Sequence, residues 1–142
     1  MKLAVDCIIA QGYTDFKIPW KYVLVRRNFD PHKGSWALPG GLVEKKDTVR
    51  ETVIAETKQE TGLDIKDDWF DIVGYVDTPD RDPRDRIVSM VAYIKLPLIR
   101  ISDDLPKLKG DHEVQELDWF LGSDALNMKL AFDHIEILKD YA

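Results

Sequence analysis

The sequence is poor in the residues and runs that mark secreted or membrane proteins. Its 142 residues include one cysteine, Cys7, so no disulfide can form within the chain. We expect this thiol to be buried in a strand and the protein to lie in the reducing cytoplasm. No segment approaches the roughly 20 apolar residues of a membrane span. Asp6 interrupts the first apolar stretch, which is too short for a signal peptide, so a soluble protein is expected.

Positive charge is also scarce. The chain has 20 Lys and Arg against 26 Asp and Glu, and its net charge of −6 argues against a nucleic-acid partner. With 44% hydrophobic and 32% charged residues, the composition is that of an ordinary globular protein. The length suits one domain over residues 1–142. An acidic protein that binds phosphate groups usually needs a divalent cation between the two negative partners.

The order of apolar runs predicts strands with interspersed helices. The run 87–94 is nearly continuous in apolar residues, which is typical of a strand covered on both faces. Helices are predicted over 47–61 and 131–141, and Pro39–Gly41 predicts a tight bend. This pattern favours an α/β fold, an α/β/α sandwich around a mixed sheet. The predicted strands span residues 2–10, 22–25, 36–38, 69–76, 87–94 and 114–120.

The helix over 47–61 has the clearest boundaries. Thr48 followed by Glu51 predicts a capping box at its start, and Gly62 predicts its end. Within it, Glu56 and Glu60 share a face with valines that should point to the core, since these positions fall within about 60° of one another at roughly 100° per residue.

Carboxylates on a core-facing side of a helix need a positive partner, because burying unpaired charge is costly. A buried Arg or Lys would make an internal salt bridge, and a metal ion would make a metal site. Spacing alone leaves both possibilities open.

Residues 41–63 resemble the Nudix box, G-x5-E-x7-R-E-U-x-E-E-x-G-U, where U is a bulky aliphatic residue. The matching positions at full spacing are Gly41, Glu56, Glu60, Gly62 and Leu63. Three further segments, residues 36–41, 80–84 and 130–134, are similar to the ADP-ribose pyrophosphatase-like branch of that family. Four matching segments in the right order are more specific than one motif.

This resemblance implies a MutT-like strand–loop–helix unit that binds Mg²⁺, or Mn²⁺, around a diphosphate. By position, the implied metal ligands are the carbonyl of Gly40 and the carboxylates of Glu56, Glu60 and Glu113, with the three glutamates also implied in catalysis. The implied reaction is hydrolysis of a nucleoside diphosphate linked to another group, ADP-ribose above all, into two monophosphates. Relatives of this kind also lead us to expect a homodimer.

The box departs from the signature at three positions where the signature has a charged residue, Asp47, Ala55 and Gln59. Ala55 and Gln59 replace an arginine and a glutamate that would be neighbours on the helix, so the net charge is preserved. We interpret this as a partly compensated change. The alternative is a sensor that binds the nucleotide without cleaving it. Regulators with degenerate boxes carry a winged-helix domain, and the chain reaches only Ala142, so a DNA-binding repressor is not expected.

Arginines provide the candidates for contact with an anionic substrate. The charged loop of residues 80–86 contains Arg81, Arg84 and Arg86, and either a solvated hairpin tip or contact with substrate phosphate or ribose would explain them. Arg27 at a strand end is a further candidate for substrate binding. Near the second predicted helix, capping and packing explain His134.

Overall fold

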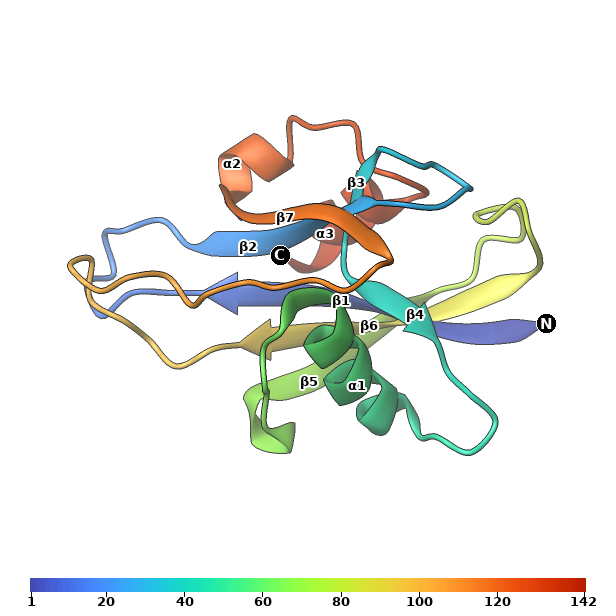
Figure 1. Cartoon of the computed structure of the whole chain (residues 1–142), viewed down its shortest axis with the longest axis horizontal. Coiled ribbons are helices and arrows are strands. Elements are labelled where there is room, and N and C mark those ends of the chain that lie inside the picture. The colour runs from blue at the N-terminus through green and yellow to red at the C-terminus, as the bar shows by residue number, and fades with distance from the viewer.

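The computed structural model describes residues 1–142 and contains a seven-stranded mixed sheet with helices on both faces (Figure 1). The strands are β1 (Lys2–Gln11), β2 (Lys21–Arg27), β3 (Trp36–Ala37), β4 (Gly40–Leu42), β5 (Phe70–Val76), β6 (Ile87–Lys95) and β7 (Val114–Leu121). The helices are α1 (Val49–Thr61), the 3-10 turn η1 (Asp67–Trp69), α2 (Gly122–Ala125) and α3 (His134–Tyr141).

Strand β1 is the centre of the sheet. It pairs in parallel with β6 along nearly its whole length, from Lys2 to Ala10. Its other edge is divided, because β4 pairs antiparallel with its first half and β2 pairs only with Ala10 and Gln11 at its end. Strand β2 therefore diverges from β1 and pairs with β3 and β7 instead. This divergence leaves an opening between the two halves of the sheet.

Each face of the sheet has its own apolar core. On the α1 side, Val53 of the helix packs with Val5, Ile9 and other buried residues. On the opposite side, Ile137 and Leu138 of α3 pack with another buried cluster that includes Ile8. Alternate residues of β1 thus serve the two cores, which explains why β1 and β6 read as nearly continuous apolar runs.

The predicted α/β/α sandwich around a mixed sheet is confirmed. The capping box of Thr48 and Glu51 is present, and Gly62 ends α1 with a left-handed φ of 78°. The tight bend predicted at Pro39–Gly41 is wrong, because Gly40 begins β4 and pairs with β1. The short helix α2 was not predicted, since its four residues carry no helical period. None of the helices is long and apolar enough to cross a membrane.

Candidate active site

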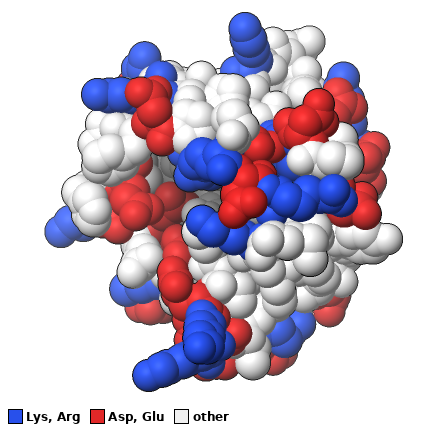
Figure 2. Space-filling model, turned by 90° about the vertical axis from the view of Figure 1, so that its right-hand side faces the viewer, with Lys and Arg blue, Asp and Glu red and all other residues white.

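A cleft of about 440 Å³ opens where β1 and β2 diverge. One wall is acidic and includes Glu56, Glu60 and Glu113, whereas the other includes Arg27 and Arg84. Figure 2 shows acidic and basic side chains gathered around a hollow on this side of the molecule. Such a cleft fits an anionic ligand. The basic wall would bind the ligand directly, and a divalent cation would link it to the acidic wall.

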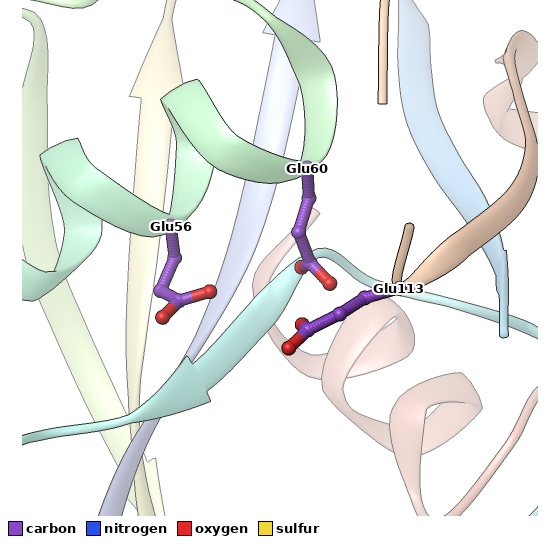
Figure 3. Close-up of side chains that lie close together, drawn as sticks. All are labelled: Glu56, Glu60 and Glu113. Atoms are coloured by element: carbon purple, nitrogen blue, oxygen red, sulfur yellow. The ribbon is translucent and has the colours of Figure 1, made fainter. Parts of the chain in front are cut away.

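Three carboxylates converge on the acidic wall. Glu56 and Glu60 point from α1 toward Glu113, which comes from the loop just before β7 (Figure 3). One carboxylate oxygen from each residue lies within 4.8 Å of the other two. The helical spacing of Glu56 and Glu60 thus places them together as predicted, and the fold adds Glu113 from a distant segment.

Strand β4 holds the two helical carboxylates in place. The backbone N–H of Gly40 donates a hydrogen bond of 2.7 Å to Oε1 of Glu60. A Cβ atom at Gly41 would lie 2.5 Å from the carboxylate carbon of Glu56, closer than real contacts allow. The glycine at this position therefore makes room for the Glu56 carboxylate against the strand.

Asn28 holds the segment that carries Glu113. Its backbone N–H donates to the Glu113 carbonyl over 3.1 Å, and its side-chain amide donates to the His112 carbonyl over 2.8 Å. At the other end of the segment, the N–H of Lys109 donates to the carbonyl of Thr61 at the end of α1. The loop before β7 is thus tied to both β2 and α1.

Crowding of these carboxylates changes their ionisation. Burial, followed by the charges of Glu113 and Asp111, raises the pKa of Glu56 to about 7. Burial raises the pKa of Glu60 to about 8, with Glu56 adding to the rise although the Gly40 N–H opposes it. Neither carboxylate takes part in an ion pair within the protein, so the internal salt bridge, one of the two possibilities that the helical spacing left open, is not formed.

The residues fit a divalent cation. Magnesium and manganese prefer carboxylate oxygens, and three such groups converge here with raised pKa values that a cation would reverse. Gly40 lies beside the cluster and is bonded to Glu60 through its N–H. The role of its carbonyl as a fourth ligand stays a prediction.

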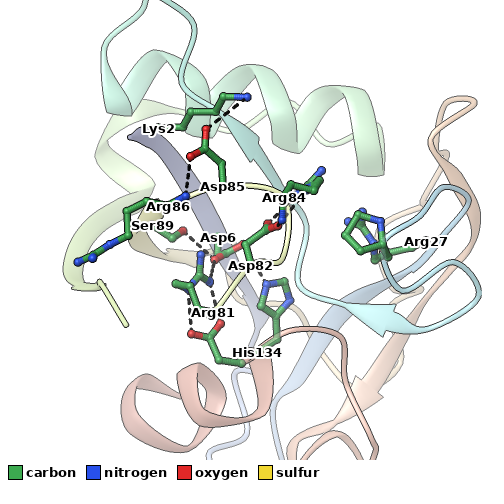
Figure 4. A network of polar contacts seen from close by, with 12 residues as sticks. Lys2, Asp6, Arg27, Arg81, Asp82, Arg84, Asp85, Arg86, Ser89 and His134 are labelled. Carbon is green, nitrogen blue, oxygen red and sulfur yellow. Dashed lines mark hydrogen bonds and ion pairs between the residues drawn. The ribbon is translucent and has the colours of Figure 1, made fainter. Parts of the chain in front are cut away.

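Arg27 is the unpaired cation of the cleft. Its Nε donates to the carbonyl of Pro31 over 2.8 Å, but it makes no ion pair, and Figure 4 shows it apart from the charged network. Burial and the nearby Arg84 guanidinium lower its pKa. Arg84 also lines the cleft and pairs with the buried Asp82 over 2.7 Å. Arg86 is exposed and does not line the cleft; it donates to the carbonyl of Asp77.

Arg81 lines the cleft as part of a largely buried polar network (Figure 4). Its side chain is only 4% exposed and pairs with Asp133 over 2.7 Å and Asp6 over 3.2 Å. Ser89 donates to Asp6 over 2.7 Å, and the N–H of Leu38 donates to Nδ1 of His134. These contacts engage Nε and Nη2 of Arg81, and Nη1 makes no hydrogen bond within the protein, so contact of Arg81 with the substrate stays a prediction.

The charge of Asp6 is stabilised by this network. His134 Nε2 lies 3.2 Å from an Asp6 carboxylate oxygen. Burial opposes ionisation, but His134, Ser89 and Arg81 outweigh it and hold the pKa of Asp6 at about 2. The network therefore ties the loop of residues 80–86 and the start of α3 to the central strand.

The sequence matches one protein family over nearly its whole length. The NUDIX domain description matches residues 2–141. The chain belongs to the Nudix family.

Several Nudix proteins are similar over most of the chain. It is 41% identical over 122 residues to the ADP-ribose pyrophosphatase of Methanocaldococcus jannaschii, covering 85% of this chain and 65% of that protein. It is 27% identical over 119 residues to the ADPR responsive transcriptional repressor NtrR of Acinetobacter baylyi, covering 82% of this chain and 44% of that protein. A MutT/nudix family protein from Enterococcus faecalis has a similar structure, with a TM-score of 0.81, 27% identity and coverage of 96% and 59%. The chain spans less than two thirds of the length of each.

The departures from the Nudix signature lie mostly away from the cleft. Ala55 and Gln59 are exposed on α1, and neither lines the cleft. Asp47 precedes the helix and is also exposed. A fourth departure is Thr57, which stands at an aliphatic position and is fully buried. The carboxylate cluster is therefore complete in spite of these changes.

The residues of this Nudix cleft that the sequence analysis did not single out include Asp6, Asn28 and Phe132. Asp6 gives a signal, because it is a charge inside an apolar strand, and a buried charge needs partners. Phe132 falls within a segment that resembles the family. Asn28 gives no signal in the sequence, because its importance comes only from contacts with a loop distant in the chain.

Proposed function

We propose that this protein hydrolyses nucleoside diphosphates linked to another group, ADP-ribose above all, with Mg²⁺ or Mn²⁺ as the cofactor. The observation that carries the proposal is the set of three carboxylates of Glu56, Glu60 and Glu113 within 4.8 Å, opposite the unpaired Arg27. A diphosphate between them would meet a cation on one side and a guanidinium on the other. The choice of ADP-ribose is supported by the Methanocaldococcus jannaschii relative, which is named an ADP-ribose pyrophosphatase.

The proposed reaction breaks one P–O bond of the P–O–P linkage between the two phosphate groups. The oxygen of a water molecule bonds to one phosphorus, the bridging oxygen leaves with the other, and the water releases a proton, so two monophosphates form. A divalent cation bound at the carboxylates would lower the pKa of the attacking water and neutralise part of the phosphate charge. Arg27 would stabilise charge on the phosphate oxygens, and the Gly40 N–H keeps the Glu60 carboxylate aimed at the cleft.

The alternative is a sensor that binds the nucleotide without cleaving it. The Acinetobacter baylyi relative is named an ADPR responsive transcriptional repressor, so a regulator occurs among the similar proteins. However, Ala55 and Gln59 lie on the exposed face of α1, so these departures do not remove a group from the cleft. The intact carboxylate cluster favours the enzyme over the sensor.

A substrate screen with a metal titration tests the proposal. We expect Mg²⁺-dependent hydrolysis of ADP-ribose or a related nucleoside diphosphate. Chromatographic separation of the monophosphate products measures it. Mg²⁺ should also raise thermal stability, by about 2.7 kcal/mol at a hundredfold excess over the dissociation constant. Both effects should vanish in Glu56→Gln/Glu60→Gln protein.

Glu136→Gln is the matched control, because Glu136 is exposed on α3 and outside the cleft. It should behave as the wild type. An undiminished metal shift in the double variant would place the metal elsewhere, and binding of ADP-ribose without hydrolysis of any substrate would favour the sensor.

Three further properties are part of the proposal: a homodimer, a cytoplasmic location and the absence of a nucleic-acid partner. The net charge of −6 supports the last of these, since it opposes attraction to phosphate backbones. Light scattering after size-exclusion chromatography tests the dimer. Titration with labelled duplex DNA at low salt tests for nucleic-acid binding.

A further inference from the structure

Two rings with unusual backbone conformations meet at the basic wall of the cleft. Phe132 has a φ of 52° and His32 a φ of 61°, and they are the only residues other than glycine with positive φ. Residues with a Cβ atom rarely adopt this conformation. The two rings contact each other edge to face, with their centres 4.6 Å apart. Contacts between distant segments thus hold Phe132 in a backbone geometry that it would not adopt alone.

Two guanidinium groups lie against the Phe132 ring. The Cζ atom of Arg27 is 4.9 Å from the ring centre, and that of Arg84 is 5.8 Å away. All three side chains line the cleft. Like charges repel, and Asp82 anchors only Arg84 whereas the Pro31 carbonyl anchors only Arg27, so a neighbour that attracts both guanidinium groups would hold them together. The electron-rich face of an aromatic ring attracts cations and provides that attraction.

We propose that Phe132 is a positioning residue whose ring holds Arg27 and Arg84 together as a site for two adjacent phosphate groups. The inference rests on the proposed function, since it assigns the diphosphate of the substrate to this wall. Ordering two arginine side chains before binding lowers the entropy that the ligand must overcome. Because Arg84 is also paired with Asp82, its orientation is fixed from both sides, and Arg27 remains without an acidic partner.

The backbone of Phe132 provides a way to separate its ring from its conformation. Asparagine adopts positive φ more readily than phenylalanine, so Phe132→Asn keeps the backbone geometry and removes the ring. Phe132→Tyr keeps the ring. Phe132→Leu, which keeps apolar packing, replaces the asparagine variant if that protein does not fold. Phe16→Leu is the control, because Phe16 is 88% exposed and does not line the cleft.

The experiment measures binding of methylenediphosphonate, a non-hydrolysable diphosphate, to the full chain by calorimetry in Mg²⁺ buffer. Phe132→Asn should bind it roughly tenfold more weakly, which corresponds to about 1.4 kcal/mol. Phe132→Tyr and Phe16→Leu should stay within about twofold of the wild type. If the ring acts through Arg27, the loss caused by Phe132→Asn should shrink to about twofold in Arg27→Gln protein, because coupled residues are not additive.

Three results would overturn the inference: no binding by the wild type, unchanged affinity in Phe132→Asn, or an undiminished loss in the Arg27→Gln background. Hydrolysis gives an independent readout. With any substrate that is cleaved, Phe132→Asn should raise KM about tenfold and leave kcat within about threefold. Absence of hydrolysis by the wild type, with the coupling intact, would overturn the proposed function and leave the paired-cation site standing.

Discussion

Burial decides what each arginine of the loop of residues 80–86 does. The sequence places Arg81, Arg84 and Arg86 on equal terms as substrate-binding candidates, since all three occur in one charged segment. The fold buries Arg81 between two carboxylates, places Arg84 on the cleft wall and leaves Arg86 outside it. Asp6, a partner of Arg81, is 75 residues away in the chain. A pairing over that separation cannot be deduced from local pattern.

Arg81→Ala should therefore destabilise the protein. Removing one member of a buried ion pair leaves uncompensated charge and costs about 3–5 kcal/mol. Urea denaturation followed by circular dichroism measures the loss. Arg86→Ala is the control, because this exposed side chain should change stability by no more than about 0.5 kcal/mol. Equal denaturation midpoints for the two variants would show that the network of Arg81 does not stabilise the fold.

Gly41→Ala tests the close approach of β4 to the carboxylate cluster. The added Cβ would lie 2.5 Å from the carboxylate carbon of Glu56, so that side chain must move. We expect Mg²⁺ affinity to fall about tenfold, or about 1.4 kcal/mol, when measured by calorimetry. Unchanged affinity would mean that the Glu56 carboxylate does not bind the metal from its present position.

At the scale of elements, α1 was the most predictable part of the molecule and β4 the least. The capping residues and the helical period of α1 are local features, so the sequence alone located Glu56 and Glu60 on one face. Strand β4 has two glycines that indicate a bend, and only its pairing with β1 makes it a strand. Glu113 was identified through family resemblance, because its approach to α1 depends on a loop whose path the pattern does not reveal.

Thr48→Ala should weaken the start of α1. The Thr48 hydroxyl accepts from the N–H of Glu51 over 3.1 Å, and the Glu51 carboxylate accepts from the N–H of Thr48 over 3.1 Å. Loss of the cap should lower the free energy of unfolding by about 1 kcal/mol in urea denaturation. The double variant with Glu51→Ala should lose less than the sum of the single changes, because the two bonds are reciprocal. Thr14→Ala, in an exposed loop, should change little.

For the whole molecule, the carboxylate cluster should make the stability of the metal-free protein depend on pH. Glu60 has a pKa of about 8 in the folded protein against an ordinary value of 4.5, and that of Glu56 is about 7. Between pH 4.5 and about 8, the folded state therefore binds more protons than the unfolded state. Its stability is greatest below pH 4.5 as far as these groups are concerned, and falls as pH rises through 7 and 8.

Thermal unfolding in EDTA between pH 5.5 and 8.5 measures this dependence. The wild type should lose stability toward pH 8.5, and saturating Mg²⁺ should remove most of the loss. Glu56→Gln/Glu60→Gln protein in EDTA should show a flatter profile and be more stable than the metal-free wild type at pH 8.5. A profile for the double variant as steep as that of the wild type would place the titrating groups elsewhere.

The pairing of β1 has a consequence for the exchange of backbone amide hydrogens with solvent. This strand is bonded to β6 along nearly its whole length, and its residues Ala4 to Asp6 are bonded to β4 on the other edge. The amides of Val5 and Asp6 lie where β1 has a partner strand on both edges, so they should exchange with deuterium only when the entire molecule unfolds. Arg81, which anchors the loop of residues 80–86, pairs with Asp6 and is thus attached to the part of the protein that opens last.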